Sequence, residues 1–129
     1  MTMKQIRNFI NGEYVASERT FDKTSPLTGE VIAKVHEADR AAVDKAVAAA
    51  RAALNGPWSR MTVAERVEKL YAVADGINRR FDEFLAAECA DTGKPVNIAS
   101  HIDIPRGAAN FKIFADVVKN VPSEFFEMS

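Results

Sequence analysis

Residues 39–57, DRAAVDKAVAAARAALNGP, decide the fold because the spacing of apolar residues changes there. Before Asp39 apolar residues recur about every second position, and after it every three to four, which predicts short strands followed by an amphipathic helix. The Asp39 carboxylate is suited to cap the first turn, and Asn55-Gly56-Pro57 is suited to end the helix. The predicted apolar face of this helix comprises Val43, Val47, Ala50 and Leu54.

On the N-terminal side of this helix the sequence predicts short strands. Apolar residues flank Asn11-Gly12, a pair that readily takes the positive φ of a tight hairpin turn. Residues 25–29, SPLTG, predict a second turn, and the β-branched run at residues 31–35 predicts a strand after it. Three or four short strands are therefore expected.

On the C-terminal side the sequence predicts a long amphipathic helix. Thr62 and Glu65 have the spacing of a capping box, and apolar residues recur at helical spacing as far as Phe84. Gly76 and residues 78–82 allow a kink or a break into two helices.

A last helix is expected to start near Pro105, because proline is tolerated in a first turn, and to end by Pro122. The predicted strands are too short to form a sheet that covers three amphipathic helices. We therefore expect apolar helix faces to stay exposed in the isolated chain. The residues expected on these faces are Val67, Leu70, Ile77, Phe111 and Phe114.

The composition excludes several classes of protein. The 129 residues carry 17 Lys and Arg against 18 Asp and Glu, and 47% of them are hydrophobic. These values are typical of a globular chain, and the charge balance argues against nucleic acid as a partner. No apolar run approaches the roughly 18 residues of a membrane span, and residues 1–10 lack the apolar segment of a secretory signal. We expect a cytoplasmic protein with neither a nucleic-acid nor a membrane partner.

Few residues are candidates for catalysis. Cys89 is the single cysteine, which excludes an internal disulfide, and the neighbouring carboxylates of Glu88 and Asp91 disfavour its thiolate. His36 and His101 lie far apart and have no partner close in sequence. Metal-ligand spacings and glycine-rich phosphate or dinucleotide motifs are absent. We expect neither a catalytic residue nor a transition-metal site in this chain.

Arg106 is the more promising residue. It precedes Gly107-Ala108-Ala109, whose small side chains leave room for a ligand, and a guanidinium binds a carboxylate in bidentate fashion. The alternative is a surface ion pair with Asp103, three residues earlier on the same helix. The residues alone leave both interpretations open.

Three stretches resemble, in order and spacing, the N-terminal signature of the NAD(P)-dependent aldehyde dehydrogenase superfamily. They are FINGEYV at 9–15, SPLTGEVI at 25–32 and ADTGKP at 90–95. HIDIPRGAANFK at 101–112 more narrowly resembles the branch that oxidises 2-hydroxymuconic and 2-aminomuconic 6-semialdehydes. The resemblance extends over essentially the whole chain but corresponds to about the first quarter of a family member.

The resemblance implies an α/β fold in which residues 1–129 form the N-terminal part of a Rossmann-like NAD-binding domain. Short strands would occupy residues 1–37 and a helical layer residues 38–121, with the catalytic and oligomerisation domains outside this chain. In the family a cysteine attacks the aldehyde, hydride passes to NAD⁺, and water hydrolyses the thioester. NAD would be bound mainly by residues beyond this chain, and the full-length protein would form a homo-oligomer.

The resemblance also implies roles for three residues. Arg106 falls in the motif whose arginine holds the substrate carboxylate in the semialdehyde branch, which favours that role over the surface ion pair. Thr24, through its backbone carbonyl, and Asp91, through its side chain, fall where many family members bind a structural monovalent cation. The alternative for Asp91 is to cap the turn at Thr92-Gly93.

The implied function is that of the N-terminal segment of an NAD-dependent dehydrogenase. It would oxidise 2-hydroxymuconate or 2-aminomuconate semialdehyde to the dicarboxylic acid in the meta-cleavage degradation of aromatic compounds. The implied partners are a small carboxylated semialdehyde and the remainder of the enzyme chain, without which this segment is expected to be inactive. The alternative is a non-catalytic helical interaction module derived from the same segment.

Overall fold

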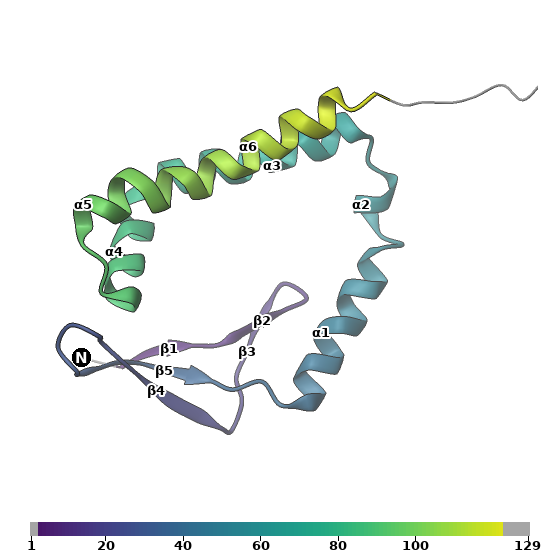
Figure 1. The fold of residues 1–129 in the computed structure, drawn as a ribbon. Helices are drawn as coiled ribbons and strands as arrows, with labels where there is room; N and C mark the ends of the chain where they lie inside the picture. The colour runs from purple at the N-terminus through teal and green to yellow at the C-terminus, as the bar shows by residue number, and fades with distance from the viewer. Residues whose placement is uncertain (1–2, 123–129) are drawn as a thin grey trace, which may run out of the picture. The chain divides into compact units, whose positions relative to one another are not determined.

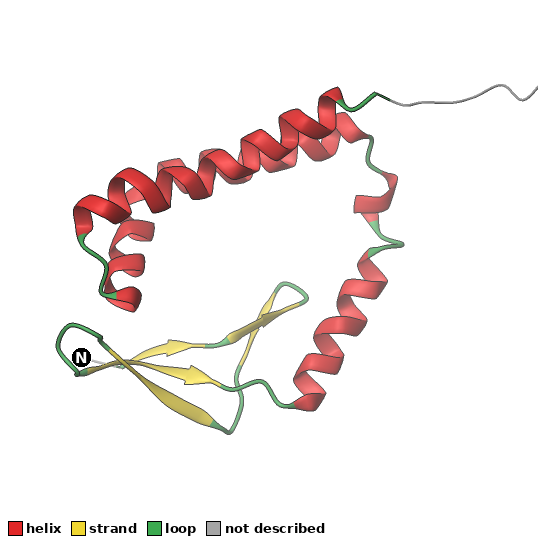
Figure 2. Cartoon of the chain, viewed as in Figure 1, coloured by secondary structure: helices red, strands yellow, loops and turns green. Residues whose placement is uncertain are grey.

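The computed structural model describes residues 3–122, which fall into two compact units. The first unit comprises residues 3–60 with Ala90–Gly93, and the second comprises Met61–Cys89 with residues 94–122. All the strands precede the first helix along the chain (Figures 1 and 2). The predicted α/β class, short strands followed by amphipathic helices, is therefore confirmed.

The first unit contains a small mixed sheet and a hairpin. Strands β1 (Lys4–Ile6), β4 (Thr20–Thr24) and β5 (Val31–His36) form the sheet in the order β1-β5-β4. β1 runs parallel to β5, and β4 runs antiparallel to it. Strands β2 (Asn8–Ile10) and β3 (Glu13–Val15) form the hairpin, in which the strands are antiparallel.

The hairpin forms at the predicted turn. Asn11 and Gly12 have φ values of 52° and 86°, the left-handed conformation that a tight turn of this kind requires. The rings of Phe9 and Tyr14, which face each other across the two strands, lie edge to face with centroids 5.1 Å apart. The local turn signal was therefore sufficient to place this element.

Helix α1 (Arg40–Ala53) begins and ends as predicted. The Asp39 carboxylate accepts a hydrogen bond of 2.7 Å from the backbone N–H of Ala42, which caps the first turn. The predicted apolar face is present but uncovered, since Val43 and Val47 are each 47% exposed. A short helix that was not predicted, α2 (Pro57–Arg60), follows after the break.

In the second unit, α3 (Val63–Arg79) starts at the predicted capping box. Glu65 Oε2 accepts a hydrogen bond of 2.7 Å from the Thr62 N–H, and Glu65 N–H donates one of 3.2 Å to Thr62 Oγ1. Helix α4 (Phe81–Thr92) follows, so the long apolar pattern does break into two helices. The break falls at Arg80, inside the segment where the sequence allowed it.

Helices α3 and α6 (Ile104–Asn120) lie side by side and form the core of the second unit (Figure 1). Small residues line the contact, which lets the two backbones approach closely. The expectation that Val67 is exposed was wrong. Val67 lies on α3, which packs against α6, and it is only 2% exposed. The buried residues of the two helices are Val67, Ala74, Ile104, Ala108 and Ala115.

Polar pairs on the same two helices run along this contact. Lys112 Nζ lies 3.1 Å from Asp75 Oδ1, and the Tyr71 hydroxyl donates a hydrogen bond to Asp116. That hydrogen bond raises the pKa of Tyr71, because it is made by the neutral phenol. Since the later residue of α3 pairs with the earlier residue of α6, the helices are antiparallel.

Helix α6 begins at Ile104, as predicted, but helical structure that was not predicted precedes it. A short helix α5 (Val96–Ile98) leads into a π-helical turn, η1 (Ala99–Asp103), and then into α6. The Ile104 N–H donates to the Ala99 carbonyl across the wide turn, so Pro105 lies where the bonding pattern changes and its missing N–H is tolerated. Among the described helices, none is long and apolar enough to cross a membrane.

Candidate functional site

The stretch from the end of α4 to the first turn of α6 holds the candidate site residues of the second unit. Lys94, which follows α4, extends its ammonium toward the π-helical turn. Its Nζ lies 2.7 Å from Asp103 Oδ2 and 3.5 Å from Glu88 Oε1. The hydrogen bond to Asp103 raises the pKa of Lys94 above its usual value. Lys94 thus links the loop after α4 to the turn that precedes α6.

Arg106 lies in the first turn of α6 with its side chain exposed. Within residues 3–122 its guanidinium forms neither a hydrogen bond nor an ion pair. The alternative interpretation, an ion pair with Asp103, is therefore wrong in this structure, because Lys94 holds the Asp103 carboxylate.

The surroundings of Arg106 are open. A Cβ built on Gly107 would meet no described atom within 4 Å beyond its chain neighbours and its own helix backbone, and Ala108 is 3% exposed. An exposed guanidinium beside so little side-chain volume can present both of its outer nitrogens to one carboxylate. The geometry thus suits the binding of an anionic group.

The two predicted cation ligands, Thr24 and Asp91, both lie in the first unit. Lys23, next to Thr24 on β4, places its ammonium 2.7 Å from Asp91 Oδ1 and 3.0 Å from the Asp91 backbone oxygen. A cation at Asp91 would meet this ammonium, and like charges at such range repel each other. The Lys23 ammonium therefore occupies the Asp91 carboxylate in this structure, and the binding of a monovalent cation there stays a prediction.

The backbone conformation and the surroundings of position 93 explain why the ADTGKP stretch has a glycine there. Its φ is +70°, and an added Cβ would come within 2.9 Å of Pro26 Cγ. Both the left-handed backbone and this close approach exclude a side chain. The contact joins the end of α4 to the 25–29 turn inside the first unit.

The histidines contact nearby backbone groups, and the cysteine forms no disulfide. Cys89 is a free, half-buried thiol on α4. His36 Nδ1 accepts from the Ser17 N–H at 2.9 Å, and His101 Nδ1 lies 2.7 Å from the Asn97 carbonyl oxygen. The described residues contain no group of three or more His, Cys, Asp or Glu side chains placed to hold a metal.

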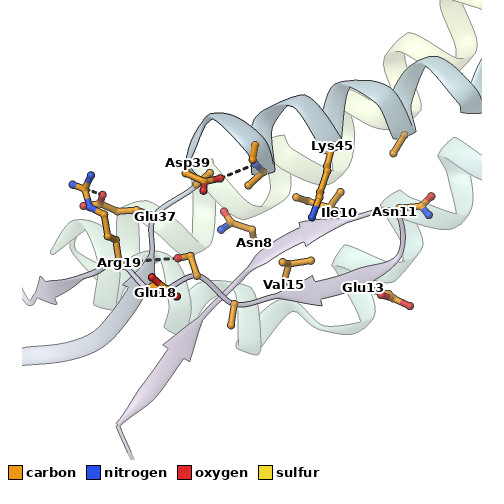
Figure 3. Close-up of a pocket in the computed structure, with 16 residues that line it drawn as sticks. Asn8, Ile10, Asn11, Glu13, Val15, Glu18, Arg19, Glu37, Asp39 and Lys45 are labelled. Carbon is orange, nitrogen blue, oxygen red and sulfur yellow. Dashed lines mark hydrogen bonds and ion pairs between the residues drawn. The ribbon is translucent and has the colours of Figure 1, made fainter.

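A pocket of about 840 Å³ lies in the first unit between the β2–β3 hairpin and α1 (Figure 3). Three of its charged groups have structural partners: Asp39 caps α1, and Glu37 forms an ion pair of 2.8 Å with Arg19. None of the predicted site residues lines it. This pocket is therefore not formed by the residues of the candidate site.

Sequence reasoning missed Lys23 and Lys94 as partners of Asp91 and Asp103. Lys23 and Asp91 are 68 residues apart, so no local pattern could reveal their contact. Lys94 and Asp103 are 9 residues apart, but the π-helical turn between them breaks the spacing that would place both on one helix face. The one available signal was the ADTGKP stretch itself, which contains Lys94.

Comparison with known proteins gives a consistent result. The model of the aldehyde dehydrogenase family matches residues 14–129. The chain is 67% identical to a 2-hydroxymuconic semialdehyde dehydrogenase of Pseudomonas sp. strain CF600, over 98% of this chain and 26% of that protein. It is 52% identical to a 2-aminomuconic 6-semialdehyde dehydrogenase of Pseudomonas sp., over 93% of this chain and 24% of that protein.

The fold also recurs in solved structures. The NAD⁺ complex of an aldehyde dehydrogenase from Bacillus cereus superposes with a TM-score of 0.91 and 36% sequence identity, over 98% of this chain and 26% of that one. The chain spans about a quarter of the length of the curated relatives it matches.

Proposed function

The chain belongs to the aldehyde dehydrogenase family, and from that premise we propose that it is the N-terminal segment of an NAD-dependent semialdehyde dehydrogenase. The observation that carries the proposal is its high identity, 67% and 52%, to two enzymes named for the hydroxymuconic and aminomuconic semialdehydes. The proposed reaction converts semialdehyde, NAD⁺ and water to dicarboxylic acid, NADH and a proton. It belongs to the meta-cleavage degradation of aromatic compounds.

The proposed role of this segment is to bind the end of the substrate that does not react. Both semialdehydes carry a carboxylate, and the exposed guanidinium of Arg106 is a suitable bidentate partner. Holding that end orients the aldehyde toward the nucleophile, which the remainder of the enzyme supplies. The segment contributes recognition rather than chemistry, so the isolated chain is inactive.

The exposed apolar residues of α6 support the participation of further chain. Phe114 is 64% exposed, and Val117 and Val118 are 54% and 50% exposed. A row of large apolar side chains on one helix is typical of a surface that another part of a protein covers. In the proposed enzyme the remaining chain covers it, binds NAD, which supplies the hydride acceptor, and forms the homo-oligomer.

The activity is tested on the full-length, purified protein. We expect NADH to form with 2-hydroxymuconate or 2-aminomuconate semialdehyde, measured by absorbance. If NADH forms with neither, the dehydrogenase proposal is wrong and the non-catalytic interaction module takes its place.

The role of Arg106 is tested by Arg106→Ala in the same protein. Loss of a charge-assisted hydrogen-bonded pair raises KM for the carboxylated substrate roughly 10- to 100-fold, with little change for a neutral aldehyde. The matched control is Arg79→Ala, which removes an exposed arginine from the end of α3. Equal effects of Arg106→Ala on both aldehydes would refute the carboxylate role.

A further inference from the structure

We propose that Lys94 is a positioning residue for substrate binding, because it holds Asp103 away from Arg106. The inference rests on the proposed role of Arg106 and adds what keeps that arginine available. Two observations carry it: the ion pair between Lys94 and Asp103, and the absence of a partner for Arg106 within residues 3–122.

Asp103 would otherwise be the natural partner of Arg106. The two residues are three apart at the start of one helix, a spacing at which opposite charges meet on the same face. An arginine so paired presents a neutralised, partly occupied guanidinium to a substrate. The ligand carboxylate would then compete with Asp103 for the same nitrogens.

In the structure Asp103 pairs with Lys94 instead. Its side chain is 29% exposed, and its Oδ2 lies 2.7 Å from Lys94 Nζ. The π-helical turn η1 ends at Asp103, so the carboxylate meets the lysine of the preceding loop rather than following the regular spacing of α6. Glu88, at 3.5 Å from the same ammonium, completes the acidic surroundings of Lys94.

The balance of charge in this cluster has a direct consequence. Glu88 and Asp103 carry two negative charges around one lysine, and Arg106 is one helical turn away. Removing the lysine leaves Asp103 without its cation, and Arg106 is then the cation placed to replace it. Substrate affinity falls although Arg106 itself is intact.

The experiment is Lys94→Met in the full-length protein. Since a partly exposed ion pair is weak, we expect KM for the carboxylated semialdehyde to rise roughly two- to fivefold, while KM for a neutral aldehyde and kcat for both stay within error. We expect Lys94→Arg, which keeps the cation, to have the wild-type KM for the carboxylated semialdehyde. The double variant Lys94→Met with Asp103→Asn, which also removes the competing carboxylate, restores it too.

Three results separate the possible failures. A rise in KM for both aldehydes after Lys94→Met overturns the proposal, because it indicates a general structural role. Failure of Asp103→Asn to restore KM in the Lys94→Met protein also overturns it, since no carboxylate then competes. Failure of the proposed role of Arg106 is seen separately: Arg106→Ala would then change KM equally for the carboxylated and the neutral aldehyde. If Lys94→Met does not fold, Lys94→Gln takes its place. KM for the carboxylated semialdehyde is then compared between Lys94→Gln and the double variant Lys94→Gln with Asp103→Asn, with the same two outcomes.

Discussion

Helix α6 has two faces of different character. The face toward α3 carries small residues, and Ala108 and Ala115 are 3% and 0% exposed. Another part of its surface carries large ones, and Phe114, next to Ala115 in sequence, is 64% exposed. Small residues allow two helices to pack closely, whereas large ones stabilise a protein only when something covers them. The difference teaches that the contact with α3 buries only part of the apolar surface of α6.

The charged residues show the same contrast. Asp91 and Asp103 each meet a lysine of the described chain, at 2.7 Å in both cases. Arg106, three residues after Asp103, forms no ion pair with an acidic residue within residues 3–122. Contacts that the segment completes by itself serve its own fold, and those it leaves open are where we propose that substrate and the remaining enzyme bind.

The largest expected effect on stability is at Phe114, on the exposed face of α6. In the full-length protein Phe114→Ala should lower the free energy of unfolding by about 3–5 kcal/mol, the cost of truncating a buried phenylalanine. Denaturant unfolding measures it, and Lys119→Ala on the same helix is the control. A loss below about 0.5 kcal/mol would mean that the remaining chain does not cover this face.

The next largest effect on stability is expected at Ala115, on the face of α6 that packs against α3. Ala115→Leu forces a larger side chain between α3 and α6 and should cost about 1–3 kcal/mol. Ala115→Ser, which adds a single atom, should cost less in the same unfolding assay. Equal stability of the leucine variant and the wild type would contradict the close contact of the two helices.

A smaller effect is expected at the start of α3, where the contacts are purely local. Thr62→Ala removes the hydroxyl that caps the helix and should cost about 1 kcal/mol, whereas Thr62→Ser keeps the cap. Thermal unfolding of the three proteins measures the difference. A serine variant as unstable as the alanine variant would show that the hydroxyl is not what stabilises the helix.

The partner of Thr62 adds a pH dependence. The hydrogen bond from the Thr62 backbone N–H, followed by that from its hydroxyl, lowers the pKa of Glu65 in the folded state. The stability from this carboxylate is therefore present above its unfolded pKa and is lost as pH falls through the lower pKa of the folded state. The difference in stability between wild type and Glu65→Gln should shrink over that range. A difference that stays constant down to strongly acid pH would contradict it.

The smallest expected effect is at Asp91. Lys23→Met removes the ammonium that holds this carboxylate, which leaves it open to a monovalent cation from solution. We expect the Tm of this variant to be slightly higher in KCl than in tetramethylammonium chloride at equal ionic strength, and the Tm of wild type and of Lys23→Arg to be the same in both salts. A K⁺ response in the wild type would instead support the predicted cation site with Thr24 and Asp91.

Local signals were predictable because neighbouring residues generate them. The Asn11-Gly12 hairpin, the Asp39 cap and the Thr62-Glu65 capping box each depend on backbone groups within three residues of the side chain. The π-helical turn before α6 was not predictable, since the apolar spacing around it resembles that of an ordinary helix start.

Pairings between distant segments were equally hidden. β1 pairs with β5 although the residues in register are 29 positions apart, and β4, TFDKT, has little strand pattern of its own. Such strands form because a partner completes their hydrogen bonds, and the partner is not encoded nearby. Lys23 and Asp91 illustrate the same rule for charge.

By itself, the sequence determined where α1 and α3 begin, where the hairpin turns and that apolar faces would need cover, because these depend on short-range hydrogen bonding and on periodicity. It also marked Arg106 but left two partners possible for it. Only the tertiary structure decided that Lys94 takes Asp103 and leaves Arg106 open, and that Val67 is covered while Phe114 is not. The physical reason is that pairing and burial depend on which segments meet in space.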